Sequence, residues 1–226
     1  MRWTAILFLS VVWPVSLWTV GCAPANPKTA SAEQALVDGS GLPDPVEAIA
    51  RWRRWRDEKR YRLIERCIES NQRRIFVDTL ICVDAFLAAN EQVQRAIAEV
   101  LGDYRTDEWD LSLVGEHLGL FSAGMEILRV DQEADRAIIS YQVGGRLPLE
   151  TASLRVGPEG WTYVPGPGAP GFPAAIRGLA MTLSDIAESI RRKGMTRERI
   201  NQEFRLRIWP RLMKALNAGL GDRAGA

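Results

Sequence analysis

Residues 126–143, EILRVDQEADRAIISYQV, decide the fold class of this 226-residue chain, because apolar and polar side chains alternate along most of them. The alternation predicts two strands, Ile127–Asp131 and Arg136–Val143. Two more strands are expected at Leu149–Val156 and Trp161–Val164, each after a glycine-containing turn. Strands this closely spaced favour an antiparallel sheet with one face on a core.

Helical patterns precede the strands. Asp44 is a suitable N-cap for a first helix, Pro45–Ser70. A second helix is expected over Arg73–Ala89, with Asn90 as the N-cap of a further turn that ends near Leu101. Helices followed by a run of short strands predict an α+β fold.

Two additional helices are expected at the C-terminus, within a segment, residues 166–217, that begins as a loop rich in Pro and Gly. The first starts near Pro173 and ends at Gly194, and Thr196 caps the second, which Pro210 should kink. We expect their apolar stripes to pack on the open face of the sheet, and the alternative is a groove-binding partner or a dimer. Residues 218–226 are expected to form a disordered tail.

Composition excludes several classes of protein. One His and three Cys exclude a His-rich metal site, a zinc ribbon and a disulfide-dense mini-protein, and we expect no metal or cofactor. The 29 Lys and Arg nearly balance the 28 Asp and Glu, so nucleic acid is not an expected partner. Basic segments at 45–74 and 173–226 flank an acidic one at 78–135. We expect these segments to pair within one domain, and the alternative is a basic face turned to anionic lipid or an acidic partner.

The N-terminus carries an export signal. Arg2 precedes an apolar run, Trp3–Val20, which ends at Gly21-Cys22. A run of this length is also just sufficient for a transmembrane anchor. The pattern resembles the lipobox of bacterial lipoproteins, although Thr19 stands where that family usually has Leu. The resemblance implies that residues 1–21 are removed and that Cys22 is lipidated with palmitate or a similar acyl chain.

Localisation follows from this resemblance. Ala23 after the cysteine resembles the sorting pattern of outer-membrane lipoproteins. The chain is then expected in the bacterial cell envelope, at the outer membrane facing the periplasm if the cell has two membranes. Residues 22–44 are rich in Ala, Pro, Ser and Gly and are expected to act as a flexible tether.

Residues 45–60 form a basic helical extension with interleaved aromatic residues. Arginines fall on the face that would have to be buried, so we expect this segment to project from the domain, whose packed part begins near Tyr61. Trp52, Arg53, Arg54 and Trp55 suit a membrane interface, with Trp among headgroups and Arg on phosphates. The alternative is a solvated helix whose Trp residues cap the domain edge.

Asp84 is the one candidate for a buried carboxylate. It falls between two apolar groups on the second helix, where burial would perturb its pKa and suit a general base. The alternative is an internal ion pair, with Arg129 or Arg155 as the expected partner. Catalysis by His117 is not expected, because no nucleophile motif accompanies it. The acidic residues near it, 103–117, lack the spacing of a calcium loop.

Cys67 and Cys82 would meet an oxidising compartment after export, which favours a disulfide. Fifteen residues along one helix would separate them by about 22 Å, so a bridge needs a turn near residues 70–72. Two buried thiols are the alternative.

The order of elements over residues 61–165 resembles NTF2-like domains, in which helices pack into a curved sheet. Gly160-Trp161-Thr162-Tyr163 fits the closing strand of that family. The resemblance implies either a binding or scaffolding domain or a small enzyme with an acid or base inside the cone, and only Asp84 fits that role. We therefore expect a lipid-anchored, non-catalytic envelope protein that holds a protein partner or ligand near the membrane. The alternative is a small NTF2-like enzyme or apolar-ligand-binding cone that uses Asp84.

Overall fold

The computed structural model describes residues 44–102, 106–145, 147, 149–166 and 168–220. The predicted export signal, Cys22 and the tether up to Pro43 lie outside these residues. So does the end of the predicted tail, whereas residues 218–220 continue the last helix.

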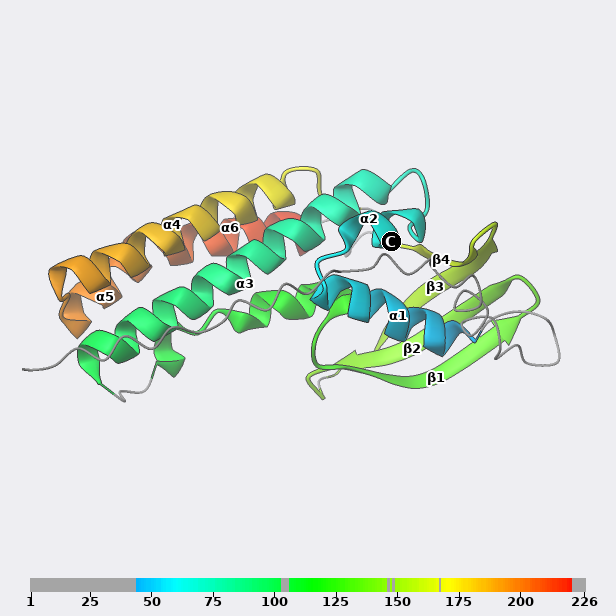
Figure 1. Cartoon of the computed structure of the whole chain (residues 1–226), viewed down its shortest axis with the longest axis horizontal. Helices are drawn as coiled ribbons and strands as arrows, with labels where there is room; N and C mark the ends of the chain where they lie inside the picture. Colours follow the sequence, from blue (N-terminus) through cyan, green and yellow to red (C-terminus); the bar gives the residue numbers. More distant parts are fainter. Residues whose placement is uncertain (1–43, 103–105, 146, 148, 167, 221–226) are drawn as a thin grey trace, which may run out of the picture. The chain divides into compact units, whose positions relative to one another are not determined.

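The sheet has the predicted antiparallel order β1-β2-β3-β4 (Figure 1). Its strands are β1 (Met125–Glu133), β2 (Arg136–Val143), β3 (Glu150–Gly157) and β4 (Gly160–Val164). Alternate residues of β2 are all buried and so form its core face: Ala137, Ile139, Tyr141 and Val143. Together with six α-helices in the described part of the chain, this confirms the α+β class.

Aromatic side chains join the inner face of the sheet to the helices. Phe76 meets the ring of Tyr163 edge-on, with the ring centroids 5.3 Å apart, and it meets Phe121 at the same distance. The segment before α3 also pairs with the sheet, because the amide of Tyr163 donates to the carbonyl of Cys67 and the amide of Glu69 donates to the carbonyl of Tyr163. The edge strand β4 is therefore covered by backbone at this point.

The first helical segment is broken, not continuous as predicted. It forms α1 (Pro45–Asp57) and α2 (Tyr61–Arg66). Between them Lys59 adopts a left-handed conformation with φ of 58°, which turns the chain. No Gly or Pro marks this break in the sequence, so periodicity alone could not locate it.

The prediction that residues 45–60 project from the domain is wrong. Ala48, Ile49 and Trp52 of α1 are each 1% exposed, and Trp52 stacks on Phe121 with a centroid distance of 6.4 Å. The helix can pack because the arginine that falls on its inner face, Arg56, has buried partners of its own.

The second predicted helix continues further than expected, as α3 (Arg73–Leu101). Asn90 lies inside it and is not an N-cap. Its buried amide instead accepts from the backbone N–H of Leu111 and donates to the Asp110 carboxylate. Short 3₁₀ segments follow, at Asp107–Trp109 and Ser112–Phe121 (η3), and η3 contacts both α1 and the sheet.

The C-terminal helices build outward from α3, on which α4 packs, and not from the sheet, which corrects their predicted position. Helix α4 (Phe172–Lys193) runs along α3 in Figure 1 and also contacts α6 (Trp209–Leu220). Gly194 ends α4 in the left-handed conformation and Thr196 caps α5 (Arg197–Glu203), as predicted. The expected irregularity lies one turn before Pro210, as a π-helical segment, η4 (Phe204–Ile208).

Candidate functional site

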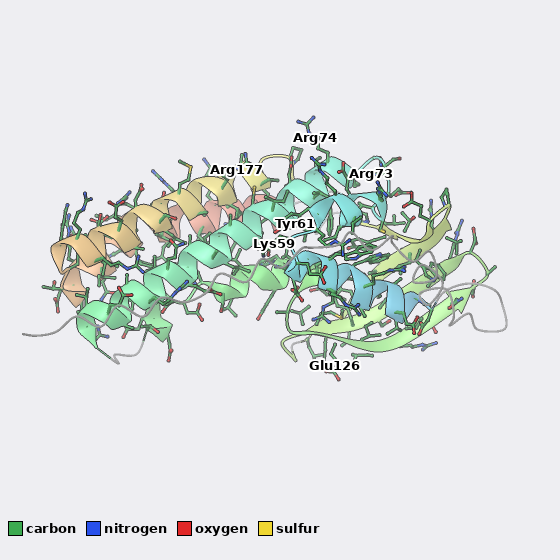
Figure 2. The ribbon with its side chains drawn as sticks, viewed as in Figure 1. Lys59, Tyr61, Arg73, Arg74, Glu126 and Arg177 are labelled. Atoms are coloured by element: carbon green, nitrogen blue, oxygen red, sulfur yellow. The ribbon has the colours of Figure 1, made fainter. Side chains whose placement is uncertain are left out.

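Asp84 lies at the centre of a buried polar cluster that joins α1, α2 and α3. One carboxylate oxygen, Oδ1, accepts from Nε and Nη2 of Arg56 at 3.0 and 2.5 Å. The other, Oδ2, accepts from the hydroxyl of Tyr61 at 2.7 Å and lies 3.4 Å from Nζ of Lys59. Figure 2 shows Lys59 and Tyr61 together where α1 ends beside α3.

The cluster explains how Arg56 is buried. Its side chain is 10% exposed and that of Asp84 is 7% exposed, so both charges have lost most of their water. Arg56 also donates to the backbone carbonyl of Phe121. A buried charge is tolerated when it is paired and its remaining hydrogen-bonding groups are satisfied.

Of the two interpretations of Asp84, the structure supports the internal ion pair. The partner is Arg56, not either of the strand arginines named as expected partners. Arg129 pairs with Asp131 on its own strand, and Arg155 pairs with Glu69. The sequence showed only that Arg56 falls near an apolar face, and a contact between residues 28 positions apart has no local signal.

Tyr61 is held as a neutral hydrogen-bond donor in this cluster. Burial raises the pKa of its hydroxyl well above the usual range, and the hydrogen bond to Asp84 raises it further. The phenol therefore keeps its proton at any physiological pH and supports the carboxylate. The cluster as a whole positions the end of α1 against α3.

The four residues predicted at a membrane interface have different environments. Trp52 is 1% exposed, so it is not available to a lipid surface in this structure. Arg53 donates to the carbonyl of Ala123 at 3.0 Å, and Arg54 is exposed. Trp55 is half-buried, with the guanidinium of Arg51 5.5 Å from its ring centroid. The cluster of interface residues is therefore split between core and surface.

The two described cysteines are buried free thiols, so the structure does not form the disulfide that the sequence leaves open. Cys82 accepts from Arg177 of α4 at 3.3 Å, whereas Cys67 ends α2 beside β4. Burial raises the pKa of the Cys67 thiol, which lowers its fraction of reactive thiolate.

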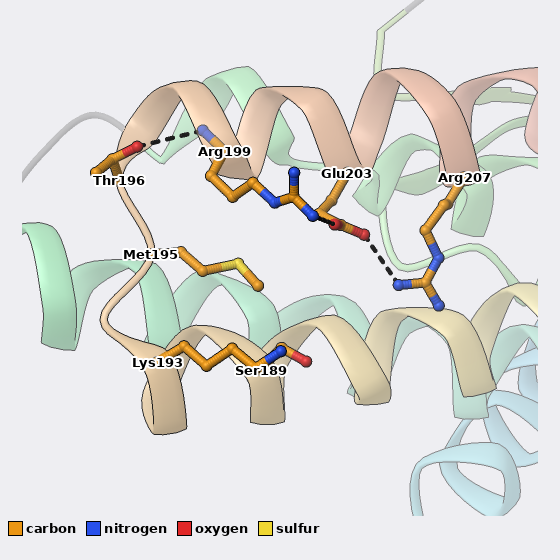
Figure 3. Close-up of a pocket in the computed structure, with 7 residues that line it drawn as sticks. All are labelled: Ser189, Lys193, Met195, Thr196, Arg199, Glu203 and Arg207. Atoms are coloured by element: carbon orange, nitrogen blue, oxygen red, sulfur yellow. Dashed lines mark hydrogen bonds and ion pairs between the residues drawn. The ribbon is translucent and has the colours of Figure 1, made fainter.

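A pocket of about 430 Å³ lies where α4 turns into α5 (Figure 3). Glu203 is central to it: one carboxylate oxygen lies 3.2 Å from Nη2 of Arg199 and the other accepts from Nη1 of Arg207 at 2.9 Å. The remaining lining residues are Ser189, Lys193, Met195 and Thr196.

The charges of this pocket suit an anionic group better than a cationic one. Three basic side chains line it against one carboxylate, and Glu203 holds two of them in place. Arg207 stands on the π-helical segment, a distortion that often accompanies functional sites. Sequence reasoning missed the pocket because its residues come from α4, the turn after it, α5 and η4. The one signal in the sequence was the excess of basic residues after position 173.

The described acidic residues near His117 do not converge on a metal site. The carboxylate of Asp110 is already hydrogen-bonded, since it accepts from Asn90 and from the backbone and side chain of Ser112. His117 is half-buried on η3. Among the described residues, no three His, Cys, Asp or Glu side chains converge as metal ligands would.

Comparisons with protein-family models, curated proteins and solved structures found no match. Among the helices of the described ranges, none has a stretch both long and apolar enough to cross a bilayer.

Proposed function

We propose that this chain is a lipid-anchored protein of the bacterial cell envelope, whose α+β body holds a protein partner or ligand near the membrane. The observation that carries the proposal is the sequence of the N-terminus, where Gly21-Cys22 follows an uncharged run of eighteen residues. A transmembrane anchor needs the run but gives no reason for Gly-Cys at its end. Acylation of Cys22 would keep the body at a membrane surface.

The chemistry of the described residues favours binding over catalysis. A general base needs a free acceptor within reach of a substrate proton. Both oxygens of Asp84 already accept bonds from Arg56 and Tyr61, and its side chain is 7% exposed. The alternative function, an NTF2-like enzyme or apolar-ligand cone that uses Asp84, would require this ion pair to open. The pocket at the α4–α5 turn offers a separate place for a small anionic ligand.

We also propose that residues 61–165 form an NTF2-like domain. Its support is the order of helices followed by a four-stranded antiparallel meander, with Trp161 and Tyr163 of the last strand buried. The helical part built on the far end of α3 would then be an addition to that domain.

Cys22→Ser tests the anchor. We expect the native chain to incorporate radiolabelled palmitate and to sediment with membranes, and the variant to lose the label and to remain unprocessed. Ala25→Ser is the matched control for a polar change nearby and should behave as the native chain. Equal palmitate incorporation by Cys22→Ser and the native chain would overturn the proposal.

Crosslinking of the tagged, lipidated chain in cells, followed by pulldown, tests the binding role. We expect a discrete crosslinked species that disappears when the partner is depleted. A purified chain that turns over a substrate, and loses that activity in Asp84→Asn while staying folded, would replace the binding role with the enzymatic one.

A further inference from the structure

The last helical segment presents apolar side chains to solvent. Leu206 is 66% exposed, Trp209 39% and Met213 52%. Trp209 and Met213 are four residues apart on α6 and so share one face, with Leu206 on the preceding turn. The opposite face is buried against the body: Phe204, Ile208, Leu212 and Ala215.

The same segment is basic. Residues 204–220 contain Arg205, Arg207, Arg211 and Lys214 and no acidic residue. Arg207 pairs with Glu203, and Arg211 donates to Thr182 on α4. Arg205 and Lys214 are exposed, and no ion pair to either is found within the described ranges. A helix that exposes a large aromatic and other apolar residues next to such basic side chains has the chemistry of an interfacial membrane helix.

We propose that this surface (Arg205, Leu206, Trp209, Met213 and Lys214; the α6 face) lies on an anionic bilayer. The inference rests on the proposed lipid anchor for its biological setting, and it adds an orientation that the anchor alone does not provide. The apolar side chains enter the region between headgroups and acyl chains, while Arg205 and Lys214 contact lipid phosphates.

The α6 face suits lipid better than α1 does. Helix α1 carries the Trp and Arg pattern that the sequence singled out, but its Trp52 is in the core. Its exposed side also includes Glu47 and Asp57, which anionic headgroups would repel. An acidic protein surface would meet the charges of the α6 face equally well, but it would not need three exposed apolar side chains beside them.

Depth-sensitive labelling of the full lipidated chain tests the proposal. A fluorophore on Met213→Cys is reconstituted into phosphatidylethanolamine–phosphatidylglycerol vesicles that contain brominated acyl chains. Met181→Cys, which is 66% exposed on α4, is the matched control. The native thiols do not interfere, because Cys67 and Cys82 are buried. We expect a blue shift and strong quenching at position 213 and neither at position 181.

Removing the basic charges tests whether the α6 face itself binds the bilayer or lies near it only because the chain is anchored there. Arg205→Gln with Lys214→Gln should lower the quenching at position 213 about fivefold or more, and phosphatidylcholine vesicles should do the same for the native residues. Equal quenching at positions 213 and 181, or none at 213, would overturn the inference. A label at 213 that stays unquenched in vesicles but becomes shielded in a crosslinked complex would assign the face to a protein instead.

The anchor and the α6 face can fail independently. Quenching at position 213 in a chain that incorporates no palmitate would leave the α6 face intact and overturn the lipid anchor. Normal palmitate labelling with no quenching at position 213 would do the reverse.

Discussion

The ion pair between Arg56 and Asp84 is the residue-scale feature on which the N-terminal helices depend. Each member of a buried pair compensates the desolvation of the other, so the loss of one leaves a charge with no partner in a poorly hydrated site. Removing Asp84 therefore affects folding more than removing any exposed acid would.

Asp84→Ala should lower the free energy of unfolding by about 3–5 kcal/mol, because Arg56 is left buried and unpaired. Urea denaturation of the purified chain measures the change. Glu91→Gln, on the exposed side of the same helix, is the control and should change stability by under about 0.5 kcal/mol. A loss below about 1 kcal/mol in Asp84→Ala would mean that water reaches the pair.

Asp110 gives the fold a dependence on acid pH. Although partial burial raises its pKa, hydrogen bonds from Ser112 and Asn90 lower the pKa below the ordinary value. The ionised form therefore favours the folded state. Its contribution is present above the unfolded pKa of about 3.9 and is lost as the pH falls through the lower, folded pKa.

Asp110→Asn should cost under about 1 kcal/mol at neutral pH, since the site is largely exposed and the amide keeps one acceptor. The difference between variant and native chain should shrink as the pH falls below about 4. Thermal melts across this range measure it. If the stability difference between the variant and the native chain stays constant down to pH 3, Asp110 is not the source of the pH dependence.

At the scale of elements, α1 shows how packing overrides an amphipathic pattern. Trp52 is enclosed by the core while Trp55, three residues later, lies at its margin. The two residues have the same side chain in the same helix, so any difference between their substitutions reports the difference in burial.

Trp52→Ala should lower stability by about 3–5 kcal/mol through the cavity left beside Phe121. Trp55→Ala should lose about 1 kcal/mol, from partial burial and the Arg51 contact. Denaturant melts of both variants test this. Similar small losses in both would restore the prediction that α1 stands away from the domain.

The accuracy of sequence reasoning differed between strands and helices for a physical reason. Strand β2 was predicted at its observed bounds, because period-two alternation identifies both an element and its buried face. The break at Lys59 and the continuity of α3 through Asn90 both depend on tertiary contacts: the polar cluster around Asp84 and the bond from Leu111. The helix propensities of the local residues report neither of these contacts.

The candidate sites were predicted less well, for the same reason. Asp84 was recognised as buried from its place between apolar residues, but its partner Arg56 was not. The pocket around Glu203 and the α6 face arise from how α5 and α6 sit against α4, which periodicity does not report. The Trp and Arg content of residues 51–56 pointed to a membrane surface, but Trp52 and Arg56 of that segment are buried.

At the scale of the molecule, α3 is shared by two layers of structure. Near the start of α3, Phe76 packs on Tyr163 of the sheet and on Phe121 of η3, and further along α3 packs on α4. A buried helix that belongs to both parts couples them, since neither can lose its packing without exposing part of α3. The described residues should therefore unfold as one cooperative unit.

Leu154→Ala in β3 and Ile186→Ala in α4 test this coupling. Both side chains are at most 1% exposed, so each substitution should cost about 2–5 kcal/mol. If the two parts are coupled, each variant shifts a single urea transition. Hydrogen exchange then accelerates both in the sheet and in the packed helices α3 and α4. Leu149→Ala, which is 49% exposed, is the control and should leave the transition near its native midpoint. Two transitions, with Leu154→Ala moving one and Ile186→Ala the other, would show that α3 joins two independent units.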